Sequence, residues 1–264
     1  TTTDLLWNFQ VPMPPNLYSS AWVNIGKLKA SGLELTLNYN VIKKNYLAYS
    51  ITLTPSYNLT NTLVSLSGTF NGADLKYGTQ ELGDMGSPGQ NQTPLALVQE
   101  GKPIGQILTY VYQGIDASGN FIFKDTNIDG KIDASDRIVT GNGLPKFLIG
   151  FGNTLNYKNW DLNIFFRGVF GHKLINSFRG FYEVPAYISS YNLPKSTANM
   201  RNANGDLLAV TSGTLSSLYV EKADFVALDN ASLGYNFTMP KTSPFSKIRV
   251  YVAGNNLGYL TKYK

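Results

Sequence analysis

Two neighbouring segments, 33–41 and 47–59, alternate between apolar and polar residues so regularly that they restrict the fold more than any other feature of the chain. The odd positions of both segments are apolar or aromatic, and the even positions are Ser, Thr and Asn with one Glu and one Ala. Side chains of a β-strand point alternately to opposite faces, so each segment predicts a strand with one apolar face and one polar face.

These strands are long enough to cross a bilayer. A tilted transmembrane strand needs roughly 9–11 residues, whereas a strand of a soluble protein usually has about 5–6 residues. Charged residues make up only 15% of the chain, against about 25% in an average soluble domain. We therefore expect an all-β fold, an antiparallel transmembrane β-barrel segment with lipid on the apolar face and a wet or plugged lumen on the other. The side chains expected to face lipid include Leu33, Leu35, Leu37, Leu47, Ile51, Leu53, Phe147, Ile149, Leu162 and Ile164.

The same patterning predicts the course of the barrel wall. About seven wall strands are expected in such a segment, near 4–11, 29–42, 45–60, 145–158, 159–172, 219–238 and 246–260. Short turns join three pairs of them, and long excursions at 61–144 and 173–218 join the others. Short periplasmic turns and long extracellular loops are typical of bacterial barrels, so both excursions are expected outside the cell. Because an odd number of strands leaves open edges, residues 1–264 are expected to be a piece of a longer polypeptide.

Composition excludes several other classes of protein. No apolar run approaches the roughly 18 residues that a transmembrane helix requires, and the absence of Cys excludes disulfide scaffolds and thiolate metal sites. The net charge is +5, and the basic residues are scattered along the sequence without forming a basic stripe, so no nucleic-acid partner is expected. The sequence has a single histidine, His172, and no Ser in a nucleophile elbow. We therefore do not expect an enzyme.

Two charged residues fall on the predicted lumen face of strand 159–172. Asp161 and Arg167 lie among positions that alternate with Trp160, Leu162 and Ile164. A charge is tolerable in a wet lumen. These two side chains are expected to hydrate the inner wall or pair with lumen neighbours, and the alternative is a contact with a plug or solute.

The most specific local motif is an acidic loop at 125–136. Oxygen-bearing residues at its positions 1, 3, 5, 9 and 12, with Gly at position 6, match the calcium loop of the EF-hand. Position 12 is Asp rather than Glu, and residues 121–123 before the loop are predicted to form a strand, so we expect an isolated loop. One structural Ca²⁺ would pin the excursion 61–144, and the alternative is an acidic turn without metal. The expected ligands are the side chains of Asp125, Asn127, Asp129, Asp133 and Asp136 and the carbonyl of Lys131.

Several short motifs follow one another in a characteristic order. They are Asn24-Ile25-Gly26, Ser31-Gly32-Leu33-Glu34, Glu100-Gly101-Lys102-Pro103-Ile104-Gly105, Tyr110-Val111-Tyr112-Gln113-Gly114-Ile115-Asp116, the acidic loop with Asp136-Arg137, Gly141-Asn142, Pro145-Lys146-Phe147, Tyr157-Lys158-Asn159-Trp160-Asp161-Leu162, Leu233-Gly234-Tyr235-Asn236-Phe237 and Gly254-Asn255-Asn256-Leu257. Together they resemble the C-terminal barrel region of SusC/RagA-type TonB-dependent outer-membrane transporters. The family's plug and final strand lie outside the match, and Ile128 stands where the family often has Gly.

The resemblance implies an active importer in the outer membrane of a bacterial cell. Such a receptor has a barrel of roughly 22 strands that is filled by a plug, with a SusD-like surface lipoprotein over its extracellular mouth. It takes up oligosaccharides or peptides, driven by the TonB complex through the plug. On this reading 61–144 and 173–218 contribute to the mouth, where Tyr182, Tyr187 and Tyr191 stack on sugar or pack within the loop. The alternative function is that of a secreted, calcium-stabilised β-sandwich that binds glycans, which would have short strands and charged wet faces.

Overall fold

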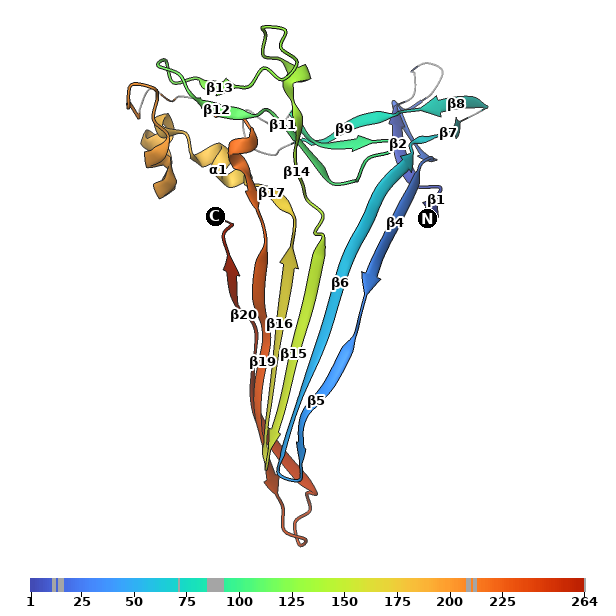
Figure 1. The fold of residues 1–264 in the computed structure, drawn as a ribbon, viewed down its shortest axis with the longest axis vertical. Helices are drawn as coiled ribbons and strands as arrows, with labels where there is room; N and C mark the ends of the chain where they lie inside the picture. Colours follow the sequence, from blue (N-terminus) through green and yellow to red (C-terminus); the bar gives the residue numbers. More distant parts are fainter. Residues whose placement is uncertain are drawn as a thin grey trace.

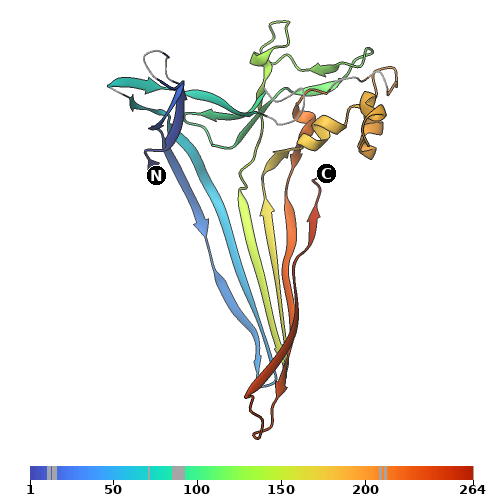
Figure 2. The ribbon, with the colours of Figure 1, turned by 180° about the vertical axis from the view of Figure 1, so that it is seen from behind.

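A computed structural model of the chain describes residues 1–10, 13, 17–70, 72–84, 93–207, 210 and 213–263. One large antiparallel sheet forms a tall wall, and smaller sheets gather at one of its ends (Figure 1). Seen from behind, the wall strands converge toward the opposite end, where short turns join them (Figure 2). We call these two ends of the wall the loop end and the turn end.

The wall is a sheet of eight strands in the order β1-β4-β6-β15-β16-β19-β20, with β5 also paired to β6. β4 and β5 lie along successive parts of the same long strand, since β4 pairs with residues 56–65 of β6 and β5 pairs with residues 47–53. The strands are β1 (Thr2–Thr3), β4 (Lys27–Glu34), β5 (Leu37–Lys44), β6 (Leu47–Ser65), β15 (Phe147–Tyr157), β16 (Trp160–Phe170), β19 (Phe225–Thr238) and β20 (Lys247–Thr261).

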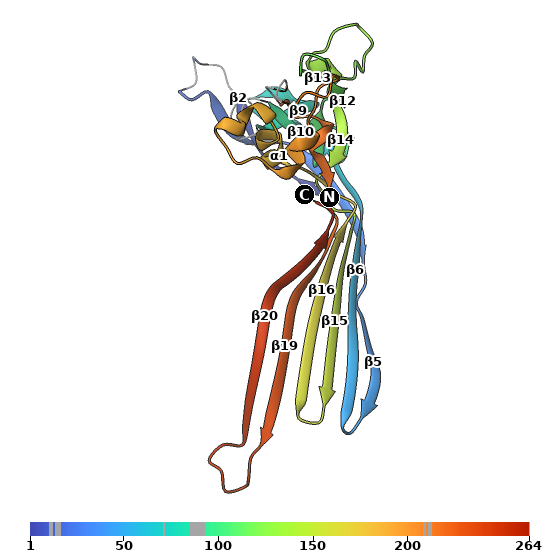
Figure 3. The same cartoon turned by 90° about the vertical axis from the view of Figure 1, so that its left-hand side faces the viewer.

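The remaining elements belong to the loop end (Figure 3). The strands pair as β2 (Leu6–Gln10) with β3 (Ser20–Asn24), β7 (Ser67–Phe70) with β8 (Ala73–Lys76), β12 (Tyr112–Ile115) with β13 (Phe121–Phe123), and β17 (Lys173–Ile175) with β18 (Val220–Lys222). A further sheet has the order β14 (Ile138–Asn142), β11 (Gln106–Thr109), β10 (Pro94–Gln99) and β9 (Thr79–Asp84). The helices are α1 (Ser177–Tyr182) and the 3-10 turns η1 (Ala134–Asp136), η2 (Pro185–Ser189), η3 (Lys195–Asn199) and η4 (Ser217–Tyr219). None of the helices in the described residues has the length and apolar character needed to span a membrane.

The register across the wall aligns the two faces of its strands. Leu53 of β6 lies opposite Phe151 of β15, which in turn lies opposite Phe166 of β16. The neighbouring row is Thr54, Gly150 and Arg167, and it belongs to the other face. A shift by one residue would exchange the two faces, so the alternation read in the sequence also sets the strand pairing.

The apolar face carries no second layer of protein in the part of the chain that the structure describes. Leu33, Leu35 and Leu37 are 65%, 53% and 49% exposed, and the other seven residues expected on this face are partly exposed. The buried clusters of the described residues contain none of these ten side chains. The sheet is therefore a barrel wall, and the sandwich alternative, which needs a second sheet on this face, is wrong.

One expected wall strand is wrong. Of the residues predicted at 4–11, Leu6–Gln10 form β2, which pairs with β3 in a separate hairpin at the loop end, and residue 11 lies outside the described residues. Trp7 and Phe9 pack there against a buried cluster that includes Ile25 and Leu66. Only the short β1 that precedes them joins the wall, beside β4. The alternation of a strand does not say which strand it pairs with, and here Trp7 and Phe9 are partly buried against the hairpin cluster.

Two predicted boundaries also differ. β6 continues to Ser65, so the excursion expected to begin at residue 61 leaves the wall later. The strand expected at 219–238 is divided, because Val220–Lys222 pairs with β17 and the wall strand begins at Phe225.

Candidate functional site

The two charges predicted on the polar face of the wall are both paired across strands. The Nη2 atom of Arg249 lies 2.5 Å from Oδ2 of Asp161, and Nε of Arg167 lies 2.6 Å from Oδ2 of Asp229. Asp229 is the extra residue of a β-bulge in β19, and the bulge turns its carboxylate toward Arg167. The interpretation that these charges pair with lumen neighbours is confirmed.

Gly234 makes room for one of these ion pairs. A Cβ atom at this position would lie 2.6 Å from Nη2 of Arg249 and 2.7 Å from Oδ2 of Asp161. Real Cβ atoms do not approach other atoms so closely, so a side chain at residue 234 would displace the ends of Arg249 and Asp161.

The acidic loop is organised by hydrogen bonds from its own backbone. The Asp125 carboxylate accepts from the N–H groups of Ile128 at 2.6 Å and Gly130 at 2.8 Å. Asn127 and Asp129 accept through Oδ1 from the N–H groups two residues further on. The sharp turn predicted at Gly130 is confirmed by its φ of 82°, and Ile128 also has a left-handed φ of 61°.

The end of the loop is tied to its start by a buried carboxylate. Asp136 is fully buried, and it accepts from the N–H of Thr126 at 2.7 Å and from the N–H of Asp133 at 2.9 Å. Hydrogen bonds from the backbone of Asp133 and Thr126 lower the pKa of Asp136. Asp133 in turn caps η1 by accepting from the N–H of Ser135 at 2.8 Å.

The predicted calcium ligands therefore lie in one closed loop, but their oxygens face the backbone. Within the described residues no three acidic or histidine side chains form a cluster of the kind that holds a metal ion. Both carboxylate oxygens of Asp125, and Oδ1 of Asn127 and of Asp129, accept one backbone N–H each. Oδ2 of Asp129 accepts from the side-chain amide of Asn127 at 2.9 Å. All these oxygens keep further lone pairs, as the carbonyl of Lys131 does. This oxygen-only set is of the type that calcium prefers, and the calcium site stays a prediction.

The excursion after β16 is held by a buried ion network. Arg179 of α1 reaches Glu183 through two hydrogen bonds of 2.7 Å and also binds Glu221 of β18. Burial alone lowers the pKa of Arg179, but the hydrogen bonds that Arg179 donates to Glu183 and Glu221 more than offset it and raise the pKa above its ordinary value. Ser196 donates to the fully buried Glu183, which ties η3 to the same centre. The network holds three segments of this excursion together.

The three tyrosines noted in the sequence lie together in this excursion. The ring of Tyr191 is 5.7 Å from the ring of Tyr182 and 6.1 Å from that of Tyr187, and Phe181 packs against all three. These ring contacts are the packing alternative considered for the three tyrosines. The single His172 is buried near Asp224, 3.9 Å away, where β16 ends.

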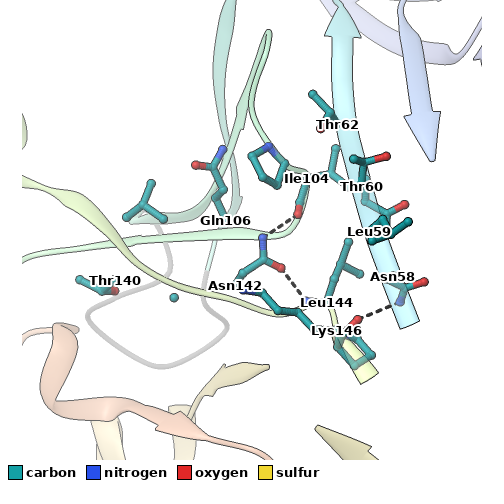
Figure 4. Close-up of a pocket in the computed structure, with 15 residues that line it drawn as sticks. Asn58, Leu59, Thr60, Thr62, Ile104, Gln106, Thr140, Asn142, Leu144 and Lys146 are labelled. Atoms are coloured by element: carbon teal, nitrogen blue, oxygen red, sulfur yellow. Dashed lines mark hydrogen bonds between the residues drawn. The ribbon is translucent and has the colours of Figure 1, made fainter. Parts of the chain in front are cut away.

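A cavity of about 480 Å³ opens where the wall meets the excursion between β6 and β15 (Figure 4). Its sides are residues 58–62 of β6, residues 103, 104 and 106, and residues 139–142 and 144–146. Asn142 braces it by donating to the carbonyl of Ile104 at 2.9 Å and accepting from the N–H of Leu144 at 2.8 Å. Asn58 donates to the carbonyl of Pro145 at 2.8 Å.

Gly105 lets the two loop segments of this cavity meet. It has a φ of 81°, and a Cβ there would lie 2.9 Å from Cγ of Leu144 and 3.0 Å from Oδ1 of Asn142. Sequence reasoning did not find the cavity. The motif that contains Gly105 gave a family resemblance only, because the residues that complete the cavity come from three separate segments.

Known proteins match this chain over nearly its whole length. TonB-dependent receptor P3 of Formosa agariphila is 32% identical over 99% of the chain, and TonB-dependent receptor SusC of Bacteroides thetaiotaomicron is 29% identical over all of it. A solved structure of the RagAB peptide transporter superposes on 99% of the chain with a TM-score of 0.77 at 20% identity. The chain is a homologue of the SusC/RagA-type TonB-dependent receptors.

The recognition made from the ordered motifs is thereby confirmed, and so is the barrel fold. The chain spans only about a quarter of the relatives it matches, namely 27% of receptor P3, 26% of SusC and 28% of the RagAB chain. Its open sheet is accordingly one sector of a receptor barrel. No protein-family model matches the chain. The names of the relatives are those of receptors and transporters, not of enzymes.

Proposed function

We propose that this chain is part of an outer-membrane receptor that imports a nutrient into a bacterial cell in a TonB-dependent manner. The observation that carries this proposal is the match to TonB-dependent receptors over nearly the full chain, on a sheet whose apolar face is left uncovered. The expected role of such a barrel sector is selective passage of a solute.

The spacing of aromatic rows on the apolar face supports the membrane location. At the turn end, Tyr157 and Trp160 pair in register, and Trp160 stacks edge-on with Tyr235 at 4.8 Å. Near the loop end, Phe147 and Phe170 are paired, with rings 6.1 Å apart. The two rows are the ends of the 11-residue strand β15, so they are about 33 Å apart along the strand at about 3.3 Å per residue. At a tilt of about 35–45° this gives roughly 23–27 Å along the membrane normal, close to the apolar band of about 25 Å in outer-membrane barrels.

Two partners follow from the same proposal. A SusD-like lipoprotein would close the extracellular mouth, and the TonB complex would act through a plug encoded elsewhere in the polypeptide. The small sheets and helices at the loop end offer the surface for the lipoprotein, because loops on a rigid scaffold commonly carry the contacts of a receptor. The substrate class is an oligosaccharide or a peptide, and the RagAB complex is described as a peptide transporter.

We also propose that the loop 125–136 binds one Ca²⁺ with a structural role. Side chains of Asp125, Asn127 and Asp129 would turn their free lone pairs to the ion, together with the carbonyl of Lys131. Asp133 and Asp136 would complete the oxygen set, at the cost of some of their present backbone hydrogen bonds. The ion would stabilise the excursion, and no reaction step is assigned to it.

Uptake by living cells tests the proposed function. In a strain that lacks the gene of the full-length receptor, accumulation of the cognate labelled oligosaccharide or peptide should fall to background, and a plasmid copy should restore it. Deletion of TonB should abolish uptake in the complemented strain as well. If accumulation of every oligosaccharide and peptide tested is the same with and without the receptor, the proposal is wrong.

A further inference from the structure

The cavity beside β6 contains a hydrogen-bond donor that nothing in the described structure uses. Gln106 begins β11, lines the cavity and is only 7% exposed, and its Nε2 atom has no hydrogen-bond partner. Buried polar atoms are nearly always paired, so an unpaired amide donor in the wall of a cavity calls for an acceptor that enters from outside.

None of the described residues accepts a hydrogen bond from that amide. Asn142 lies directly opposite Gln106 in the register, but its amide group is already engaged with Ile104 and Leu144. Thr140 shares a hydrogen bond of 2.7 Å with Thr109 on the neighbouring strand. The Gln106 Nε2 donor is therefore left without an acceptor from the described part of the chain.

The lining indicates the charge of that ligand. Among the described residues no carboxylate lines the cavity, and the one charged side chain of the lining is the exposed Lys146 at the rim. The polar groups of the lining are otherwise amides and hydroxyls, including those of Asn61 and Thr62, and Leu59, Ile104 and Val139 add apolar area. The volume of about 480 Å³ falls within the range of roughly 300–1,000 Å³ found for small-molecule sites.

We propose that this cavity is a binding subsite for an uncharged solute group that accepts a hydrogen bond from Gln106, such as a sugar hydroxyl or a peptide carbonyl. Thr62 on β6 lines the same space from the opposite side, so the bound group would bridge the barrel wall and the excursion. The proposed import function enters this proposal in one respect only, because it names the solutes that would reach the subsite. Its existence rests on the buried donor and the uncharged lining.

Calorimetric titration of the full-length receptor in detergent tests this subsite. The probes are a neutral glucan hexasaccharide and an alanine tripeptide with both ends blocked, and they distinguish the two sources of the group. One of them should bind the unsubstituted receptor. Gln106→Met keeps the size of the side chain and removes the donor, so it should weaken that binding roughly tenfold, which corresponds to about 1.4 kcal/mol. Thr62→Val should weaken it by a smaller factor, about threefold.

Gln113→Met is the matched control, because Gln113 lies exposed on β12, away from the cavity, and its replacement should leave the affinity unchanged. If Gln106→Met does not fold, as judged by heat-dependent gel mobility, Thr62→Val decides the outcome. The subsite is refuted if neither probe binds, if the affinity survives both cavity substitutions, or if a structure of the full-length receptor shows the cavity filled by its own polypeptide. If the subsite is refuted while receptor-dependent uptake persists, the import function is still supported and only the subsite is wrong.

Discussion

Replacing Leu53 by Arg should destabilise the receptor in a membrane, because Leu53 lies on the apolar face near the middle of the wall. It is opposite Phe151 of β15 and Leu37 of β5. Leu47, six residues earlier on β6, is opposite Tyr157 in the aromatic row at the turn end, and Tyr57, four residues later, is opposite Phe147 in the other row. Residue 53 therefore lies between the two aromatic rows, and a guanidinium group there would lie in the hydrocarbon layer of the membrane.

The magnitude follows from this depth. Six residues correspond to about 20 Å along the strand and four residues to about 13 Å. At a tilt of about 45° Leu53 is then roughly 14 Å from one aromatic row and 9 Å from the other, close to the midplane. An Arg on the lipid face of a barrel costs about 2–4 kcal/mol at that depth.

The assay is equilibrium unfolding of the full-length receptor in lipid vesicles, followed by tryptophan fluorescence in guanidinium. Thr52→Arg is the control, because Thr52 is the next residue and points to the polar face, where its hydroxyl donates to Asn38 at 2.7 Å. That substitution loses one exposed hydrogen bond, so it should cost no more than about 1 kcal/mol. Equal losses of stability for the two variants would show that the apolar face does not contact lipid.

Four further predictions address the turns and clusters of the structure. Gly105→Ala should cost about 1–2 kcal/mol for its left-handed backbone alone, and solute affinity should fall with it in the calorimetric assay. Gly234→Ala should displace the ion pair above it and cost about 1–3 kcal/mol, as overpacking usually does, whereas a silent substitution in vesicle unfolding would contradict the observed geometry. Ile128→Gly should stabilise the acidic loop by about 0.5–1 kcal/mol, because glycine adopts the left-handed φ at this position without the steric strain of a β-branched side chain. The gain in stability should appear as slower amide hydrogen exchange in the loop. Chelation of calcium should increase proteolysis between residues 125 and 136, and Asp125→Ala should make cleavage there independent of chelator; cleavage that ignores both changes would exclude the metal.

Much of the wall could be predicted because its information is local. A strand that is apolar at every second position has only one way to place that face against lipid, and its register with neighbours follows from the same constraint. The pairs Leu53–Phe151 and Phe151–Phe166 show how directly the pattern becomes structure. The sharp turn at Gly130 was predictable for the same kind of reason, because the ligand spacing around it leaves that position to a residue without a side chain.

The sequence by itself determined the fold class, the faces of the wall strands, the division into a turn end and a loop end, and the family. Only the tertiary structure decided which strands pair and which side chains meet. It placed residues 6–10 in a hairpin rather than in the wall, brought Asp229 to Arg167 through a bulge, and assembled a cavity around Gln106 from three distant segments. Periodicity describes what a strand does with its own side chains, whereas pairing and cavities depend on contacts between residues that the chain separates by tens of positions.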